Sequence, residues 1–142
     1  MLPNIQYPLT IYYDASCPLC ATEMHTIKEI DDENKLILVD CSNQDFNEPA
    51  FCPASKAEMM ERIHAQDAAG NWISGVDVFA IAYSAAGFKK LGRIWGSQTL
   101  KPIFNRLYPL IADNRYWLSK TPLPNLLNQL LKMYVSKPQT KT

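Results

Sequence analysis

The sequence has no excess of charge of either sign, since 14 Lys and Arg residues balance 14 Asp and Glu residues. Nucleic-acid binding requires a cluster of basic side chains, so we expect no nucleic-acid partner. No segment approaches the ~18 uninterrupted apolar residues of a membrane-spanning helix. The first residues also lack the basic start and apolar run of a signal peptide. These absences predict a globular protein that works in the cytoplasm.

A chain of 142 residues, 47% of them hydrophobic, is long enough to bury a core without disulfides or metal. We predict a core region over residues 7–87 and a helical C-terminal extension over 88–136 that packs on the same domain. Residues 137–142 are polar and are expected to form a flexible tail.

The first half of the chain alternates strand and helix patterns. A strand at 9–13, a helix at 18–31 and a strand at 36–39 predict a parallel βαβ unit. The strand at 36–39 is a continuous apolar run, which is typical of a strand covered on both faces.

A second group of elements follows the βαβ unit. The pattern predicts a helix from Pro53 to about Met60, with Cys52 or Ser55 at its start. A hairpin of 62–66 and 71–74 follows, and then a helix capped by Asp77 and closed by Gly87. The order βαβ–α–ββ–α predicts an α/β protein of thioredoxin-like fold. Such a fold has a mixed sheet of four strands with helices on both faces.

The second half of the chain is predicted to be wholly helical. One apolar stripe runs from Leu100 to Leu107, Pro109 is expected to break or restart the helix, and a second segment continues to 119. A strongly amphipathic helix covers 123–134. We favour its docking on its own domain, and the alternative is a projecting helix that forms a homodimer or contacts a membrane surface.

The segment Cys17-Pro18-Leu19-Cys20 stands between the first strand and the first helix. Two cysteines at positions i and i+3 lie on the same side of a helical turn, close enough to form a disulfide. Pro18 suits the first helical position, so Cys17 becomes the N-cap. Its sulfur then faces unpaired N–H groups and the positive end of the helix dipole, which lowers the pKa of the thiol.

The two thiols are therefore expected to differ. Cys20 lies one turn into the helix, on the face of Met24 and Ile27, and should be more buried and less acidic. We predict an enzyme in which Cys17 attacks a substrate disulfide and Cys20 resolves the mixed disulfide. This chemistry requires a disulfide-containing substrate, protein or small thiol, and an external electron donor, but no metal or organic cofactor.

The segment Asp14-Ala15-Ser16-Cys17-Pro18-Leu19-Cys20 resembles the DxxCxxC signature of the DCC family of predicted thiol–disulfide oxidoreductases. Similar stretches are Val39-Asp40, the segment 70–75, Tyr108 and the segment 114–116, so the resemblance covers roughly residues 7–120. It implies a thioredoxin-like fold and disulfide exchange, with Asp14, Cys17 and Cys20 as the site residues.

Several interpretations stay open from the sequence. Asp14 could transfer a proton through water, or it could bond the backbone of its own loop. Cys41 and Cys52 could form a second disulfide or relay electrons, although two free thiols are the simpler interpretation. Cys17 and Cys20 could instead bind Cu(I) or Zn. The chain could also be a non-catalytic interaction protein that uses its C-terminal amphipathic helix.

Overall fold

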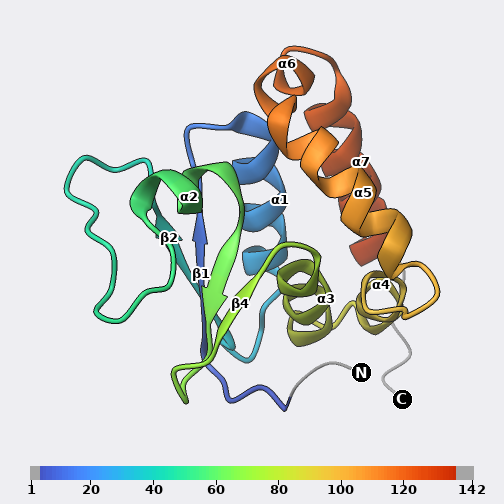
Figure 1. The fold of residues 1–142 in the computed structure, drawn as a ribbon. Helices are drawn as coiled ribbons and strands as arrows, with labels where there is room; N and C mark the ends of the chain where they lie inside the picture. Colours follow the sequence, from blue (N-terminus) through green and yellow to red (C-terminus); the bar gives the residue numbers. More distant parts are fainter. Residues whose placement is uncertain (1–3, 137–142) are drawn as a thin grey trace.

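The computed structural model describes residues 4–136, which build a four-stranded sheet with the order β2-β1-β3-β4 (Figure 1). The strands are β1 (Leu9–Tyr13), β2 (Leu36–Asp40), β3 (His64–Gln66) and β4 (Trp72–Ser74). The pair β1–β2 is parallel, whereas β1–β3 and β3–β4 are antiparallel. The predicted α/β class with a mixed sheet is therefore confirmed.

Helices alternate with the strands and then follow them. The first three are α1 (Pro18–Glu29), α2 (Lys56–Glu61) and α3 (Val76–Ala85). The helical extension consists of α4 (Lys89–Trp95), α5 (Lys101–Asp113), α6 (Arg115–Ser119) and α7 (Leu123–Ser136). The order βαβ–α–ββ–α is the predicted one, the domain boundaries at 87 and 136 stay a prediction, and the predicted tail lies outside the described residues.

The two faces of the sheet bury different sets of residues, because side chains alternate along a strand. Leu9, Ile11 and Tyr13 of β1 belong to the main core, which α1 and α3 cover. Tyr12 points to the opposite face and packs with Cys41 and Met59, beside α2. Helices therefore cover both faces.

The strand β2 differs from its prediction. It was expected to be covered on both faces, but only Leu36 is fully buried and Ile37 is 45% exposed. The reason is its position at the edge of the sheet, beside β1 alone. Hydrophobic content did not distinguish an edge strand from a central one.

The start of α2 differs in part. The helix begins at Lys56, not at Pro53, and Ser55, one of the two residues expected at its start, is its N-cap. The Ser55 hydroxyl accepts from the Glu58 N–H, and the Glu58 carboxylate accepts from the Ser55 N–H. This reciprocal pair is a capping box, which fixes where the helix starts.

Asp77 was predicted to cap α3, and this was wrong. The helix starts two residues earlier, and its N-cap is Gly75, with a φ of +69° that favours glycine. Asp77 instead lies in the first turn and forms an ion pair with Lys101 of α5, with an N–O distance of 3.4 Å. Asp77 therefore pairs with a residue far away in the sequence and does not cap its own helix.

Pro109 does not break the chain into two helices, as had been expected. It lies inside α5, which continues to Asp113. Tertiary contacts hold the helix on both sides of the proline: Phe104 packs on Trp95, with ring centroids 4.7 Å apart, and Ala112 is buried. Packing of this kind outweighs an unfavourable intrinsic propensity.

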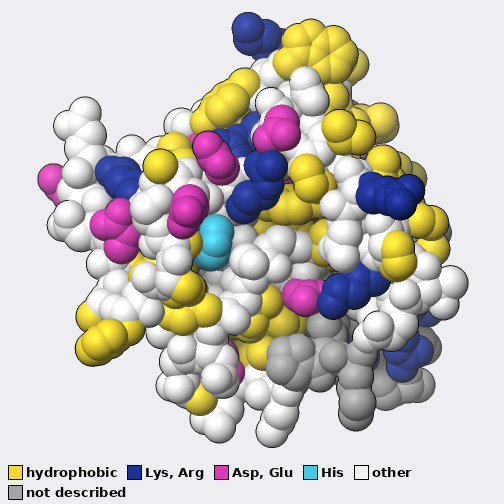
Figure 2. Space-filling view, viewed as in Figure 1, with side chains coloured by type: hydrophobic (Ala, Val, Ile, Leu, Met, Phe, Trp, Pro, Cys, Tyr) yellow, Lys and Arg dark blue, Asp and Glu magenta, His cyan; other side chains and the backbone are white. Residues whose placement is uncertain are grey.

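The extension lies along α1 and over its N-terminal end, where α6 sits (Figure 1). Leu131 of α7 is buried in the main core, and Thr26 of α1 donates a hydrogen bond of 3.3 Å to Asn128. The outer side of the extension is apolar, and hydrophobic side chains gather over α5 and α6 in Figure 2. None of the helices within residues 4–136 is long and apolar enough to span a membrane.

Candidate active site

Cys17 is the N-cap of α1, as predicted. Its sulfur accepts a hydrogen bond from the backbone N–H of Cys20, with an N–S distance of 3.5 Å, and Pro18 occupies the first helical position. The loop between β1 and α1 thus places the sulfur against the free N–H groups of the helix start.

The relative burial of the two thiols is the reverse of the prediction. Cys17 is fully buried, at 0% exposure, whereas Cys20 is half-buried. The cover comes from α6: the Ser119 hydroxyl lies 3.7 Å from the Cys17 sulfur and also accepts from the Leu19 N–H at 3.3 Å. The prediction was wrong because a contact across 102 positions of sequence closes the helix end.

The predicted difference in acidity is confirmed. A hydrogen bond from the Cys20 thiol, aided by the Cys20 N–H, the Ser119 hydroxyl and the Arg115 charge, lowers the pKa of Cys17 to about 6 against the opposing effect of burial. The same hydrogen bond, together with burial, raises the pKa of Cys20. These shifts favour a thiolate on Cys17 and a protonated thiol on Cys20.

Asp14 connects the cysteine loop with α6. One carboxylate oxygen accepts from the N–H and the hydroxyl of Ser16, and the other accepts from the Tyr116 hydroxyl and from Arg115 at 3.3 Å. The side chain is only 2% exposed. The bonds from Ser16 agree with the interpretation that Asp14 bonds its own loop, whereas the bonds from Tyr116 and Arg115 were not predicted, and proton transfer by Asp14 stays a prediction.

Arg115 joins three parts of the structure. It pairs with Asp14, and it donates a bond of 3.0 Å to the Glu61 carbonyl at the end of α2. Among residues 4–136, the Nε of Arg115 is the one buried side-chain nitrogen that has no hydrogen-bond partner. Next to it, the Tyr108 hydroxyl accepts from the Ile63 N–H at 2.9 Å, so α5 is also tied to the segment before β3.

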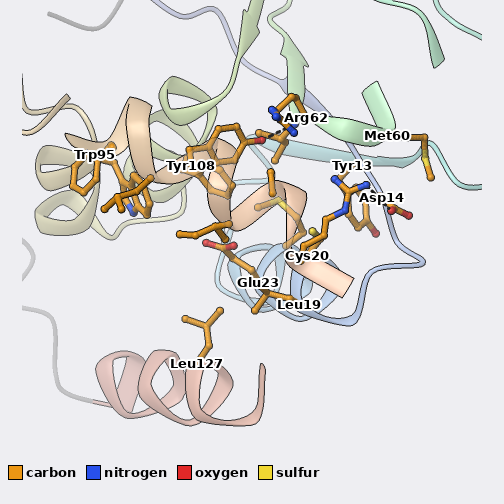
Figure 3. Close-up of a pocket in the computed structure, with 18 of the residues that line it drawn as sticks. Tyr13, Asp14, Leu19, Cys20, Glu23, Met60, Arg62, Trp95, Tyr108 and Leu127 are labelled. Carbon is orange, nitrogen blue, oxygen red and sulfur yellow. Dashed lines mark hydrogen bonds and ion pairs between the residues drawn. The ribbon is translucent and has the colours of Figure 1, made fainter. Parts of the chain in front are cut away.

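A cavity of about 420 Å³ lies between the core and the extension, and we call it the Cys20 cavity. Cys20 and Glu23 of α1 line it, as do Tyr108 and Trp95, and Leu127 of α7 points toward it (Figure 3). Glu23 accepts from the Tyr83 hydroxyl at 2.6 Å, and burial raises the pKa of its carboxyl group. Cys17 is not part of the cavity wall.

The other two cysteines lie apart from this site. Cys41 is fully buried and Cys52 is half-buried, both in the smaller core with Tyr12 and Met59, and both are free thiols. Burial raises the pKa of Cys41 to about 12, which disfavours its thiolate. No group of three or more His, Cys, Asp or Glu side chains within residues 4–136 is arranged to hold a metal ion, so a metal-binding function would rest on Cys17 and Cys20 alone.

A thioredoxin-like sheet with a Cys-x-x-Cys pair at the start of its first helix defines a protein of the thiol-redox class. The chain belongs to the DCC1-like thiol-disulfide oxidoreductase family, whose model matches residues 11–121. It is similar to an uncharacterized chloroplastic protein of Arabidopsis thaliana, with 28% identity over 123 residues. That match covers 84% of this chain and 56% of the relative, so the chain spans little more than half of the relative's length. No solved structure matches the chain.

The sequence did not reveal every side chain of the site. Arg115 and Tyr116 lie in a stretch that resembled the family, which was the only signal for them. Glu23 follows Cys20 by one helical turn and could have been placed on the same face from the period alone. Ser119 carried no signal, because its role depends on how α6 packs.

Proposed function

We propose that this protein is a thiol–disulfide oxidoreductase that uses Cys17 and Cys20 as its redox pair. The observation that carries the proposal is the thiolate on Cys17, with a pKa of about 6, beside the protonated thiol of Cys20. A thiolate is the nucleophile in disulfide exchange, and a thiol of low pKa is also the better leaving group. Membership of the family supports this chemistry.

The overall reaction balances in atoms and electrons. The Cys17 thiolate, the Cys20 thiol, one substrate disulfide and one proton give a Cys17–Cys20 disulfide and two substrate thiols. An external dithiol or equivalent donor then reduces the pair again. Asp14 acts as a positioning residue, because its contacts hold the cysteine loop against α6.

Two orders of attack are compatible with this reaction. In the order predicted from the sequence, Cys17 attacks the substrate and Cys20 resolves the mixed disulfide, and α6 has to move away from the buried Cys17. In the other order, the substrate forms its mixed disulfide with Cys20, and Cys17 resolves it.

The first test is the pH dependence of Cys17 alkylation in a Cys41→Ser/Cys52→Ser background, with mass spectrometry to locate the label. We expect the rate on Cys17 to titrate with an apparent pKa near 6. The matched control is Cys20→Ala in the same background, which removes the hydrogen-bonding thiol and should move the apparent pKa of Cys17 upward. A value near the ordinary ~8.5 in both proteins would contradict the proposal.

We further propose that the protein acts in the cytoplasm. The sequence composition supports this location, whereas the Arabidopsis relative is described as chloroplastic. Fractionation of cells that express the full-length natural protein, followed by immunodetection, tests it, and enrichment in an organelle would contradict it.

A further inference from the structure

The Cys20 cavity has the size and the lining of a small-molecule site. Its volume of about 420 Å³ falls within the ~300–1,000 Å³ of ligand pockets. Phe79, Trp95 and Phe104 form an aromatic part of its wall. Leu107 and Ile111 also line it and are 46% and 45% exposed, so its entrance is apolar as well. The exposed part of the wall therefore includes apolar side chains that an apolar molecule can contact.

The charged side chains of the cavity wall are already partnered. Arg62 pairs with Asp113 at 3.0 Å, and Arg115 pairs with Asp14 at 3.3 Å. The Glu23 carboxyl group accepts a hydrogen bond from the Tyr83 hydroxyl, and burial raises its pKa, which favours the neutral form. A ligand that carries carboxylates would thus lose its hydration without gaining an ion pair, which is costly in an apolar site.

One polar group of the wall still lacks a partner. The Nε–H of Arg115 is buried, has no hydrogen-bond partner and can donate one further hydrogen bond. Buried donors of this kind normally find a partner. A neutral ligand with an acceptor atom could take this hydrogen bond after a shift of the guanidinium toward the cavity.

Only one sulfur of the redox pair can be reached from this cavity. Cys20 forms part of the wall, whereas Cys17 is fully buried behind Ser119. Thiol–disulfide exchange is a displacement in which the attacking, central and leaving sulfurs are in line. A substrate sulfur in the cavity can be in line with Cys20 as the central atom, and Cys17 then reaches Cys20 from the protein side.

We propose that the Cys20 cavity is the substrate site for a neutral, apolar small-molecule disulfide, and that the mixed disulfide forms on Cys20. This inference rests on the proposed thiol–disulfide function and assigns Cys17 the resolving step.

The steps are as follows. The Cys20 thiol gives its proton to the Cys17 thiolate, and the resulting Cys20 thiolate attacks the substrate disulfide. One substrate thiolate leaves and takes the proton from Cys17. The Cys17 thiolate then attacks the Cys20 sulfur, the second substrate thiolate leaves, and solvent protonates it. Two electrons pass from the cysteine pair to the substrate, and Cys17 is the thiolate again just before it resolves.

The test compares two aromatic disulfides that both release a coloured thiol: neutral 4,4′-dithiodipyridine and 5,5′-dithiobis(2-nitrobenzoate), which carries two carboxylates. Cys17→Ser and Cys20→Ser variants are made in the Cys41→Ser/Cys52→Ser background. Rates are divided by those of free cysteine, and mass spectrometry locates the adduct. We expect the Cys17→Ser protein to react faster than the Cys20→Ser protein, with a preference for the neutral probe about tenfold or more above that of free cysteine.

Substitutions of two exposed leucines of α5, Leu107 and Leu110, supply the matched control. Leu107→Lys places an ammonium group at the cavity wall, where it attracts the dianionic probe, and should reduce the preference for the neutral probe. Leu110 does not line the cavity, so Leu110→Lys should leave the preference unchanged. Faster reaction on Cys17, or no preference beyond that of free cysteine, would overturn the inference. If the parent protein also fails to form the Cys17–Cys20 disulfide on oxidation, the proposed function fails with it. If that disulfide does form, only the cavity inference is lost.

Discussion

Replacing Asp14 by Asn is the sharpest perturbation of the contact between the cysteine loop and α6. The Asp14 side chain is 2% exposed and its partner Arg115 is 11% exposed, so the variant leaves a buried guanidinium without its counter-charge. Breaking a buried pair in this way costs about 3–5 kcal/mol. Since Arg115 keeps its bond to the Glu61 carbonyl, we expect a loss of about 2–4 kcal/mol in the free energy of unfolding.

The control is the ion pair between Arg62, at the end of α2, and Asp113 of α5. Arg62 and Asp113 are closer, with an N–O distance of 3.0 Å, but Asp113 is 63% exposed. Asp113→Asn should therefore cost only about 0–1 kcal/mol. Urea unfolding of the reduced proteins, followed by circular dichroism, measures both losses. An equal effect of the two variants, or a larger one for Asp113→Asn, would refute the reasoning that burial decides the strength of these pairs.

Three further predictions concern the thiolate and the packing of the extension. Ser119→Ala removes one hydrogen bond to Cys17, so the apparent pKa of Cys17 alkylation should rise, whatever the loss of the covering hydroxyl does to the absolute rate; an unchanged pH profile would show that the hydroxyl has no effect on the thiolate. Because the pKa of Cys17 is lower in the folded than in the unfolded protein, its contribution to the stability of the reduced form is present above pH ~8.5 and is lost as the pH falls through about 6. Urea midpoints should thus rise between pH 6 and ~8.5, and much less in Cys17→Ser. A Cβ on Gly92 would lie 1.9 Å from the Ser84 hydroxyl and 3.0 Å from the Ala80 carbonyl, so Gly92→Ala should destabilise by about 1–3 kcal/mol, with partial recovery when Ser84→Ala is added. Melting temperatures of the single and double variants measure this, and no loss in the single variant would contradict the close packing of α3 and α4.

The element order and the reactive pair were readable from the sequence because they depend on local rules. Strands and helices follow the hydrophobic period and the turn residues, and these gave βαβ–α–ββ–α directly. Pro18 at the first helical position made Cys17 the N-cap, and the free N–H groups at a helix start are a property of the helix alone. The direction of the difference in acidity followed from the contact between Cys17 and Cys20, to which Ser119 and Arg115 of α6 add.

Everything that depends on α6 had to come from the tertiary structure. Ser119 covers Cys17, and Arg115 and Tyr116 bond Asp14, across separations of 101 and 102 positions that no local pattern encodes. The same docking of the extension reversed the expected burial of the two thiols and closed the Cys20 cavity. Local sequence decided which sulfur is the thiolate, whereas tertiary packing decided which sulfur a substrate can reach, because exposure depends on what the rest of the chain places over a site.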